Sequence, residues 1–344
     1  MPDRPTHRPH ASRRVRLEDL ARDCGVSIAT VSRALSGEGG VRPDLRDRVQ
    51  EAAQRLGYAQ PALLAGRRVI LAATQPAVVD YGRNQFTLGV LEGVKARAAA
   101  LRMEVAMRRI ASPADEAAAV AEAASDPQVA GLLLLTPGDD EAAARLRGAQ
   151  VPAVLINGDD PYLRLGSVAP ANRAAAALAT DLLLSYGHRR ILLLTRPGRR
   201  TITRREEGYA DRMAEAGLPA ALQEVPDWVP DLAAEALRHR IETRGRDFTA
   251  VLCTGDSLAV GALMALADLG IAVPHEVSVM GFDGYPQAAL QSPPLSALEI
   301  PMQQIGATAL DLLAEAVARP ASPARRVEIA CGIVERGSTG PAPL

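Results

Sequence analysis

The 344-residue chain has few aromatic residues, few cysteines and no long apolar run. Because aromatic residues make up only 3% of the chain, its core must rest on Ala, Leu, Val and Ile. Cys24, Cys253 and Cys331 are far apart and form no C-x-x-C pattern, which indicates neither a disulfide framework nor a zinc site. The first 16 residues lack the hydrophobic segment of a signal peptide, and no run is long enough to span a membrane. We therefore expect a cytoplasmic protein without membrane contact.

The small net charge of −1 conceals an uneven distribution along the chain. Residues 1–68 contain 13 Arg against 8 acidic residues, a net charge of +5, so the remainder of the chain sums to −6. A basic N-terminal region suits contact with phosphates without requiring a basic protein overall. Residues 1–14 are rich in Pro, His and Arg, and we expect a disordered basic arm there.

Two short helices around a sharp turn are predicted for residues 17–35, LEDLARDCGVSIATVSRAL. The apolar residues of the first helix recur at the i, i+3, i+4 and i+7 positions: Leu17, Leu20, Ala21 and Cys24. Gly25 suits the left-handed conformation that ends a helix, and Ser27 is a natural N-cap, so the second helix should begin at Ile28. A third helix is expected over residues 43–56.

The second helix should turn Val31, Ala34 and Leu35 inward and leave one face for a partner. An exposed Ile28 beside Arg33 suits the DNA major groove, where Arg pairs with guanine and apolar side chains meet thymine methyl groups. Short hydroxyl side chains on the same helix can reach phosphates. The predicted DNA-binding residues of this segment are Ser27, Ile28, Ala29, Thr30, Ser32 and Arg33. The alternative is a three-helix module that binds protein or is only structural.

The run CGVSIATVSRALSG, followed by VRPDLRDRVQEAAQRLGY, resembles the DNA-binding headpiece of the lactose-repressor and galactose-repressor family, whose signature is GVS-x-x-TVSR. The resemblance implies a headpiece at residues 15–57, a hinge linker at 58–68 and a two-lobed effector-binding and dimerisation domain at 69–340. It also implies a hinge helix that wedges a leucine into the minor groove, for which Leu63 and Leu64 are candidates. Gln60 and Pro61 depart from the family pattern, so these leucines could instead pack on the next domain.

Beyond residue 68, short apolar runs alternate with longer amphipathic ones, which predicts parallel strands joined by crossover helices. Strands are predicted at residues 69–74, 103–108, 129–135, 152–157, 191–195, 250–254 and 277–282. Helices are predicted at residues 86–101, 113–125, 141–147, 172–186, 204–216, 232–244 and 257–269. The fold class is therefore a small all-α helix-turn-helix headpiece followed by two doubly wound α/β lobes, which resemble a periplasmic-binding-protein-like effector domain. In that family the chain crosses between lobes three times, so residues 301–319 should return as a helix to the first lobe and residues beyond about 325 to the second.

Polar side chains at several strand ends suit a small hydroxylated ligand. Asn157, Asp256 and Asp283 each lie at the end of a predicted strand. The resemblance implies that Arg205 forks onto the effector and that Trp228 stacks against a sugar ring, and one hypothesis places Arg205 and Asp283 on opposite sides of the cleft. Other interpretations stay open, since Asp256 could N-cap the following helix, Arg205 could form a surface ion pair and Trp228 could belong to the core.

Three positions depart from the family's polar ligand contacts, namely Gly255, Gly284 and Ile300. A carbohydrate is the favoured effector class, and a smaller or less hydroxylated molecule, or none, is the alternative. No dinucleotide or metal-binding spacing is present, so we expect no cofactor. The residues around Ser257 spell the GDSL of a hydrolase family, but the late Asp-x-x-His that would activate a serine is missing.

The sequence therefore predicts a transcriptional repressor that is not an enzyme. It should bind a palindromic double-stranded DNA operator as a homodimer, under control of a small-molecule effector. Residues 337–344 are too short and too rich in Gly and Pro for a tetramerising helix. A rival class is a soluble solute-binding protein, which would have a signal peptide and no headpiece.

Overall fold

The computed structural model describes residues 17–36, 41–55, 64–75, 77, 81–137, 140–149 and 151–343. The chain divides into two compact units, Met1–Arg67 with Leu101–Met103, and the rest from Arg68 onward. The expected basic arm and most of the expected hinge lie outside the described residues. Within the described residues, no helix has the length and apolar character needed to cross a bilayer.

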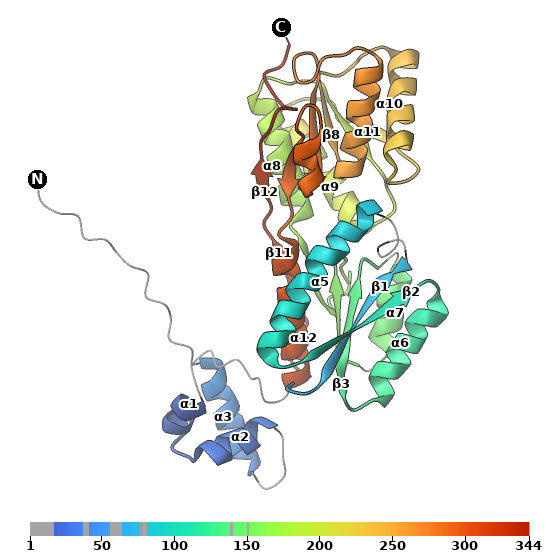
Figure 1. The fold of residues 1–344 in the computed structure, drawn as a ribbon. Helices are drawn as coiled ribbons and strands as arrows, with labels where there is room; N and C mark the ends of the chain where they lie inside the picture. The colour runs from blue at the N-terminus through green and yellow to red at the C-terminus, as the bar shows by residue number, and fades with distance from the viewer. Residues whose placement is uncertain are drawn as a thin grey trace, which may run out of the picture. The chain divides into compact units, whose positions relative to one another are not determined.

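The first unit contains a three-helix headpiece, with α1 (Leu17–Cys24), α2 (Ile28–Ser36) and α3 (Pro43–Arg55) (Figure 1). Gly25 has a φ of +66°, the left-handed conformation expected after the first helix. The hydroxyl of Ser27 accepts a hydrogen bond from the N–H of Thr30 at 3.1 Å, so the predicted N-cap is confirmed. The three helices bury one small core, made of Leu20, Ala21, Cys24, Val31, Ala34, Leu35, Val49, Ala52 and Ala53.

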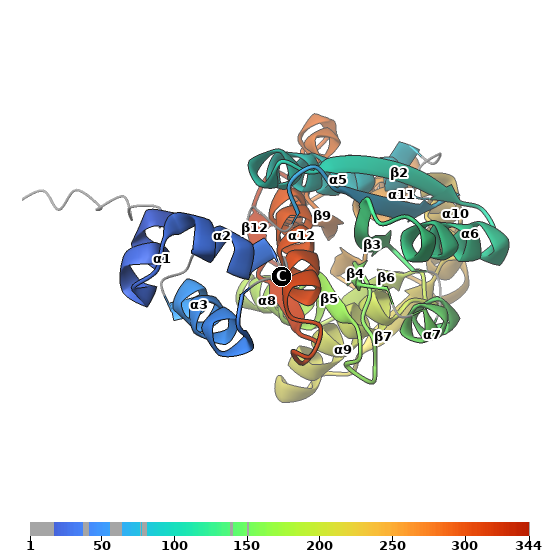
Figure 2. The ribbon, with the colours of Figure 1, turned by 90° about the horizontal axis from the view of Figure 1, so that it is seen from below.

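The second unit contains two six-stranded sheets, each covered by helices on both faces. The first sheet has the order β11-β5-β4-β3-β1-β2, and all of its neighbouring strands run parallel. Its strands are β1 (Arg68–Thr74), β2 (Glu104–Ile110), β3 (Val129–Leu135), β4 (Ala153–Ile156), β5 (Gly166–Pro170) and β11 (Arg326–Ile329). Its helices are α5 (Tyr81–Leu101), α6 (Pro113–Ser125), α7 (Asp140–Gly148) and α12 (Met302–Ala318). Figure 2 shows α6 and α7 on one side of this sheet and α5 and α12 on the other.

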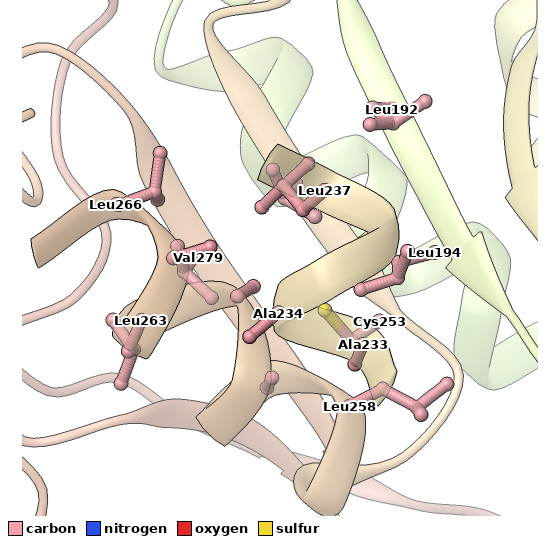
Figure 3. Close-up of a cluster of buried hydrophobic side chains, with 14 of the residues drawn as sticks. Leu192, Leu194, Ala233, Ala234, Leu237, Cys253, Leu258, Leu263, Leu266 and Val279 are labelled. Atoms are coloured by element: carbon pink, nitrogen blue, oxygen red, sulfur yellow. The ribbon is translucent and has the colours of Figure 1, made fainter. Parts of the chain in front are cut away.

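The second sheet has the order β12-β10-β9-β8-β6-β7, in which only the short β12 runs antiparallel to its neighbour. Its strands are β6 (Ile191–Thr195), β7 (Ala221–Glu224), β8 (Ala250–Cys253), β9 (Ser278–Asp283), β10 (Ser296–Glu299) and β12 (Gly332–Val334). Its helices are α8 (Asn172–Ser185), α9 (Arg200–Glu215), α10 (Pro230–Arg244) and α11 (Asp256–Asp268), and a 3₁₀ turn, η1, spans Pro286–Leu290. Leucine and valine side chains of β6, β8 and β9 pack against leucine and alanine side chains of α10 and α11 (Figure 3), as the scarcity of aromatic residues requires.

The chain crosses between the two lobes three times, as expected: after β5, after β10 and after β11. The expectation that everything beyond about residue 325 returns to the second lobe is wrong for β11. Residues Arg326–Ile329 pair in parallel with β5 in the first sheet, and only β12 joins the second sheet. The strands β5, β7, β10, β11 and β12 were not predicted, because they are short and, in part, polar.

The C-terminal residues pack against the second lobe and form hydrogen bonds with it. The buried ring of His188 lies with its nitrogens 2.9 Å from the hydroxyl of Thr249 and 3.1 Å from the carbonyl oxygen of Gly340. The N–H of Val279 donates to the carbonyl of Ser338 at 2.7 Å. Residues 337–343 form no helix, as predicted, but they are part of the packed lobe rather than a detachable tail.

Candidate DNA-binding surface and effector cleft

The α2 helix presents the face that the sequence predicted. The Ile28 side chain is 47% exposed although it is large and apolar, and both Ala29 and Arg33 are exposed beside it. The hydroxyls of Ser27 and Thr30 lie 2.8 Å apart at the start of the helix, and the half-buried Ser32 lies one position before Arg33. A solvent-exposed isoleucine next to an arginine on the second helix of a helix-turn-helix is the arrangement that suits base edges in a major groove.

Of the two leucines predicted to enter the minor groove, Leu64 belongs to the described residues. Leu63 lies outside the described residues. Leu64 is only 2% exposed, and its carbonyl accepts a hydrogen bond from the N–H of Arg67 at 3.0 Å. Its burial favours the interpretation in which Leu64 packs against protein in this conformation, whereas insertion into DNA would require it to move.

A cavity of about 460 Å³ lies between the two lobes of the second unit. In the first lobe the lining residues include Thr136 and Asn157, which follow strands, Glu116 in the first turn of α6 and Arg145 in the last turn of α7. Lining residues of the second lobe include Arg196, Arg199, Arg205, Trp228, Ser257 and Asp283. The cavity therefore occupies the carboxyl ends of parallel strands, and four of the five predicted effector residues, Asn157, Arg205, Trp228 and Asp283, line it.

Arg205 is held rigidly at the cavity wall. Its Nε donates to the side-chain oxygen of Asn172 at 2.8 Å and its Nη1 to the carbonyl of Thr254 at 2.5 Å. The guanidinium lies 3.6 Å from the ring centre of Phe282, and its Nη1 is 3.6 Å from a carboxylate oxygen of Asp283. The hypothesis that Arg205 and Asp283 face each other across the cleft is wrong, because both belong to the second lobe and form an ion pair.

The Asp283 carboxylate is paired on its other side with the start of α11. Its Oδ2 accepts from the N–H of Asp256 at 3.3 Å, and Oδ2 of Asp256 accepts from the N–H of Tyr285 at 2.8 Å. Burial raises the pKa of Asp283 to about 6, although Arg205 opposes the shift. Burial and the neighbouring Asp283 raise the pKa of Asp256 to about 7. The pair of carboxyl groups therefore keeps a bound proton up to a pH close to neutral.

Asp256 lies behind the cavity wall and does not line it. It is 4% exposed, and its second carboxyl oxygen, Oδ1, has no hydrogen-bond partner among the described residues. The alternative that Asp256 is the N-cap of the following helix is wrong, because the cap is Gly255 and α11 begins at Asp256. Contact between Asp256 and an effector stays a prediction.

Two of the departures from the family pattern have steric causes. A Cβ atom on Gly255 would lie 2.8 Å from the indole ring of Trp228, so the tryptophan occupies the space that a side chain would need. Gly284 has a φ of +73°, and a Cβ there would lie 2.7 Å from the backbone of Glu299. Ile300 is buried and adds no polar group to the cavity.

Backbone strain gathers at the strand ends that line the cavity. Thr136, Asn157 and Asp283 have φ angles of 51°, 54° and 147°. Such conformations cost about 1–3 kcal/mol each and concentrate at ligand sites. The amide of Asn157 donates to the hydroxyl of Thr136 at 3.4 Å, but its buried Oδ1 has no partner among the described residues. An unsatisfied acceptor at the cavity wall is a position where a ligand hydroxyl would be stabilised.

Four charged residues that line the cavity were not predicted from the sequence. Arg145 donates to both carboxylate oxygens of Glu116, at 3.1 and 2.9 Å, although Glu116 is only 4% exposed. Arg196 and Arg199 follow β6, and the guanidinium of Arg199 lies 5.3 Å from the ring centre of Trp228. The run of arginines directly after the predicted strand at 191–195 was a usable signal for the latter two. The Arg145–Glu116 pair joins two helices and had no such signal.

A helix-turn-helix unit together with a two-lobed α/β unit around a polar cavity defines a ligand-responsive transcriptional regulator. Residues 16–60 match the model of bacterial regulatory proteins, lacI family, and residues 180–339 match that of the periplasmic binding protein-like domain. The HTH-type transcriptional regulator MalR of Streptomyces coelicolor is 32% identical over 347 residues, covering 95% of this chain and 97% of the relative. The ribose operon repressor of Escherichia coli is 27% identical, covering 94% of this chain and 99% of the relative. The chain belongs to the lacI family of bacterial regulatory proteins.

The solved structures show the same architecture. The transcriptional regulator CelR in its cellobiose complex superimposes with a TM-score of 0.70 at 25% identity, covering 94% of this chain and all of that structure (100%). The lac repressor dimer bound to operator superimposes with a TM-score of 0.70 at 24% identity, which supports the fold.

Proposed function

We propose that this protein is a transcriptional repressor that binds a palindromic operator as a homodimer and releases or retains it in response to a carbohydrate in the interlobe cavity. The observation that carries the DNA-binding part is the exposed α2 face, where Ile28 and Arg33 lie side by side. We further propose that residues 15–57 form the headpiece, 58–68 the hinge and 69–340 the effector and dimerisation domain. The protein acts in the cytoplasm, where its DNA is.

The chemistry of the cavity supports a hydroxylated effector. Arg205 and Asp283 offer planar donors and acceptors side by side, and Asn157 offers an unsatisfied acceptor opposite them in the first lobe. Trp228 lines the same cavity and adds an aromatic ring, which suits the apolar face of a sugar. The names of the relatives support this class, since one is a ribose operon repressor and one solved structure is a cellobiose complex.

Regulation requires that the effector bind the DNA-bound and DNA-free conformations with different affinity. The difference supplies the whole switching free energy, typically about 1–3 kcal/mol per coupled site. The cavity is lined by both lobes, so a ligand that contacts Asn157 in one lobe and Arg205 in the other would bias the lobes toward closure.

A hydrolase using Ser257 is the alternative that can be tested on the cavity itself. Ser257 lines the cavity, but among the described residues that line it there is no histidine that could take its proton. The relatives are transcriptional regulators. Both observations support a regulator that is not an enzyme.

Selection of binding sites from random DNA with the full-length protein tests the proposed function. We expect enrichment of a two-fold symmetric sequence, and titration of a carbohydrate panel should then shift the affinity for that sequence. Analytical ultracentrifugation of the complex should give two chains per operator. Failure to enrich any sequence at moderate salt would reject the DNA-binding part, and a symmetric operator that no carbohydrate affects would reject the effector part.

A further inference from the structure

An ion pair joins the two lobes of the second unit beside the cavity. Asp159 follows β4 in the first lobe, and its Oδ2 accepts a hydrogen bond from Nη2 of Arg204, in α9 of the second lobe, at 2.5 Å. The nearby residues Asn157 and Arg205 line the cavity, whereas the two partners of this pair do not. The pairing therefore does not depend on an occupant of the cavity.

The carboxylate of Asp159 depends on arginines from both lobes. The residue is 8% exposed, and its Oδ2 also lies 3.1 Å from Nη1 of Arg326, at the start of β11 in the first sheet. Arg326 is itself paired with Glu328. The other carboxylate oxygen of Asp159, Oδ1, is buried and has no hydrogen-bond partner among the described residues. Without Arg204, the buried charge would keep only an arginine that it shares with another carboxylate, and this favours its exposure to water.

Both partners of the pair are fixed to their own lobes. The loop that begins with Asp159 is held in the first lobe by the next residue, Asp160, whose buried carboxylate pairs with Arg147 of α7 at 2.6 Å. Arg204 lies on the 16-residue helix α9, and the buried Tyr209 of that helix donates to a carbonyl of β6 at 2.7 Å. Movement of one lobe relative to the other therefore acts directly on the distance between the two charges.

We propose that the Asp159–Arg204 ion pair is a latch that holds the two lobes around the cavity without the help of an effector. This inference goes beyond the proposed function, because it concerns the equilibrium between two positions of the lobes and not a ligand. The side chain of Arg204 is 28% exposed, so water and salt weaken the attraction. A latch of this strength biases the lobes without locking them, and an effector can still shift the equilibrium.

Acrylamide quenching of the fluorescence of Trp228 in the full-length protein tests the latch. Trp228 is the only tryptophan of the chain, is half-buried and lines the cavity, so opening of the lobes exposes it to the quencher. Arg204→Gln should raise the ratio of open to closed molecules about fivefold, which corresponds to about 1 kcal/mol, the upper range for an exposed pair. Quenching should rise accordingly. Arg204→Lys keeps the charge and should stay closer to the wild type.

The matched control is Arg212→Gln, on the same helix. The side chain of Arg212 is 35% exposed and pairs with Asp181 of α8 at 2.6 Å, so this variant loses the same charge within the second lobe and keeps the interlobe pair. Its quenching should equal that of the wild type. Raising KCl from about 0.1 M to about 1 M should increase quenching in the wild type, because the pair is screened, and much less in Arg204→Gln. An equal rise in both variants, or an equal salt dependence in the wild type and Arg204→Gln, would overturn the inference.

Melting curves identify a role in stability alone. If Arg204→Gln lowers the melting temperature while quenching of the folded protein stays at the wild-type value, the pair stabilises the fold without controlling the lobes, and the latch is rejected.

Titration of the wild type with a panel of neutral mono- and disaccharides tests the proposed function separately. Sugar binding, together with quenching that Arg204→Gln leaves unchanged, would overturn the latch and leave the effector site intact. Raised quenching in Arg204→Gln, together with a wild type that binds no sugar, would support the latch and count against a carbohydrate effector.

Discussion

Replacing Arg205 with Ala should destabilise the second lobe as well as impair effector binding. The side chain is 5% exposed and connects three segments, through Asn172 at the start of α8, Thr254 after β8 and Asp283 at the end of β9. Its removal leaves the carboxylate of Asp283 buried without its counter-charge. An arginine at this position is therefore part of the lobe's framework.

The expected cost follows from these contacts. Removing one partner of a buried ion pair costs about 3–5 kcal/mol. Because Arg205 lines the cavity, water can fill the space that Ala leaves, which places the expected loss near the lower limit, about 3 kcal/mol. Against a typical total of about 5–15 kcal/mol for a domain, the variant should remain folded but lose a large fraction of its stability. Arg205→Lys, which keeps the charge but loses the planar fork, should cost about half as much.

Urea unfolding followed by Trp228 fluorescence measures this effect directly. Trp228 is the only tryptophan of the chain and lies in the second lobe beside the site, so its signal reports that lobe and not the headpiece. Asp283→Asn in the Arg205→Ala background should recover at least about 1 kcal/mol, because the unpaired charge is then gone. The loss caused by Arg205→Ala should also be smaller at pH 5 than at pH 8, because Asp283 is protonated at the lower pH.

A loss below about 1 kcal/mol for Arg205→Ala would refute the reasoning, because that is the range of an exposed ion pair. Failure of Asp283→Asn to recover any stability would show that the cost does not arise from an uncompensated carboxylate. DNA binding by the headpiece provides the control, since its core shares no residue with the second lobe.

Three further predictions concern other parts of the molecule. Arg33→Ala should weaken specific DNA binding by about 1–3 kcal/mol and relax the preference at one base pair per half-site, measured by binding-site selection at fixed salt; unchanged sequence preference would mean that Arg33 reads no base. Burial raises the pKa of Asp256 to about 7, so folding favours the protonated carboxyl. The stability that this carboxyl contributes is fully present below its ordinary pKa and is lost as the pH rises through about 7. In urea titrations between pH 4 and 8, Asp256→Asn should therefore show a smaller fall in the free energy of unfolding with rising pH than the wild type. Burial lowers the pKa of His188, so the stability that the neutral ring contributes is present above the ordinary pKa of histidine and is lost as the pH falls below it. Melting curves of His188→Gln should show a lower stability than the wild type at pH 7.5. On acidification to pH 5 the variant should lose less stability than the wild type, by about 1 kcal/mol.

The headpiece could be predicted almost residue by residue because its signals are local. The helix start at Ile28, the cap at Ser27 and the turn at Gly25 each depend on neighbours within four positions, and the structure shows all three. The inward set of Val31, Ala34 and Leu35 follows from the same periodicity.

The two lobes were predictable where strands are long and apolar, as in β1, β3 and β6. β10 is short and follows closely on Ser292, Pro293 and Pro294, and β11 begins with an arginine, so neither shows an apolar run. Both are defined by pairing with strands that precede them by many residues, a property that periodicity cannot detect.

Some residues of the cavity could be predicted because long apolar runs show where strands end. Asn157 and Asp283 follow apolar runs, which marks strand ends in any parallel sheet. Their actual relation to other groups was not predictable, because it depends on the packing of separate elements. Asp256 is turned toward the backbone of Tyr285 instead of the cavity, and Arg145 reaches Glu116 from another helix.

The late crossing between the lobes has a consequence for how the chain acquires its structure during synthesis. The headpiece is built from consecutive residues and can form as soon as α3 has left the ribosome. Neither lobe can complete its sheet before the last part of the chain is synthesised. β11 completes the first sheet, and β12 and the residues around Ser338 complete the second. A product that terminates just before Arg326 therefore retains a whole DNA-binding unit attached to two sheets that each lack an edge strand. Premature termination near the end of the coding sequence thus leaves both lobes incomplete, whereas the headpiece stays intact.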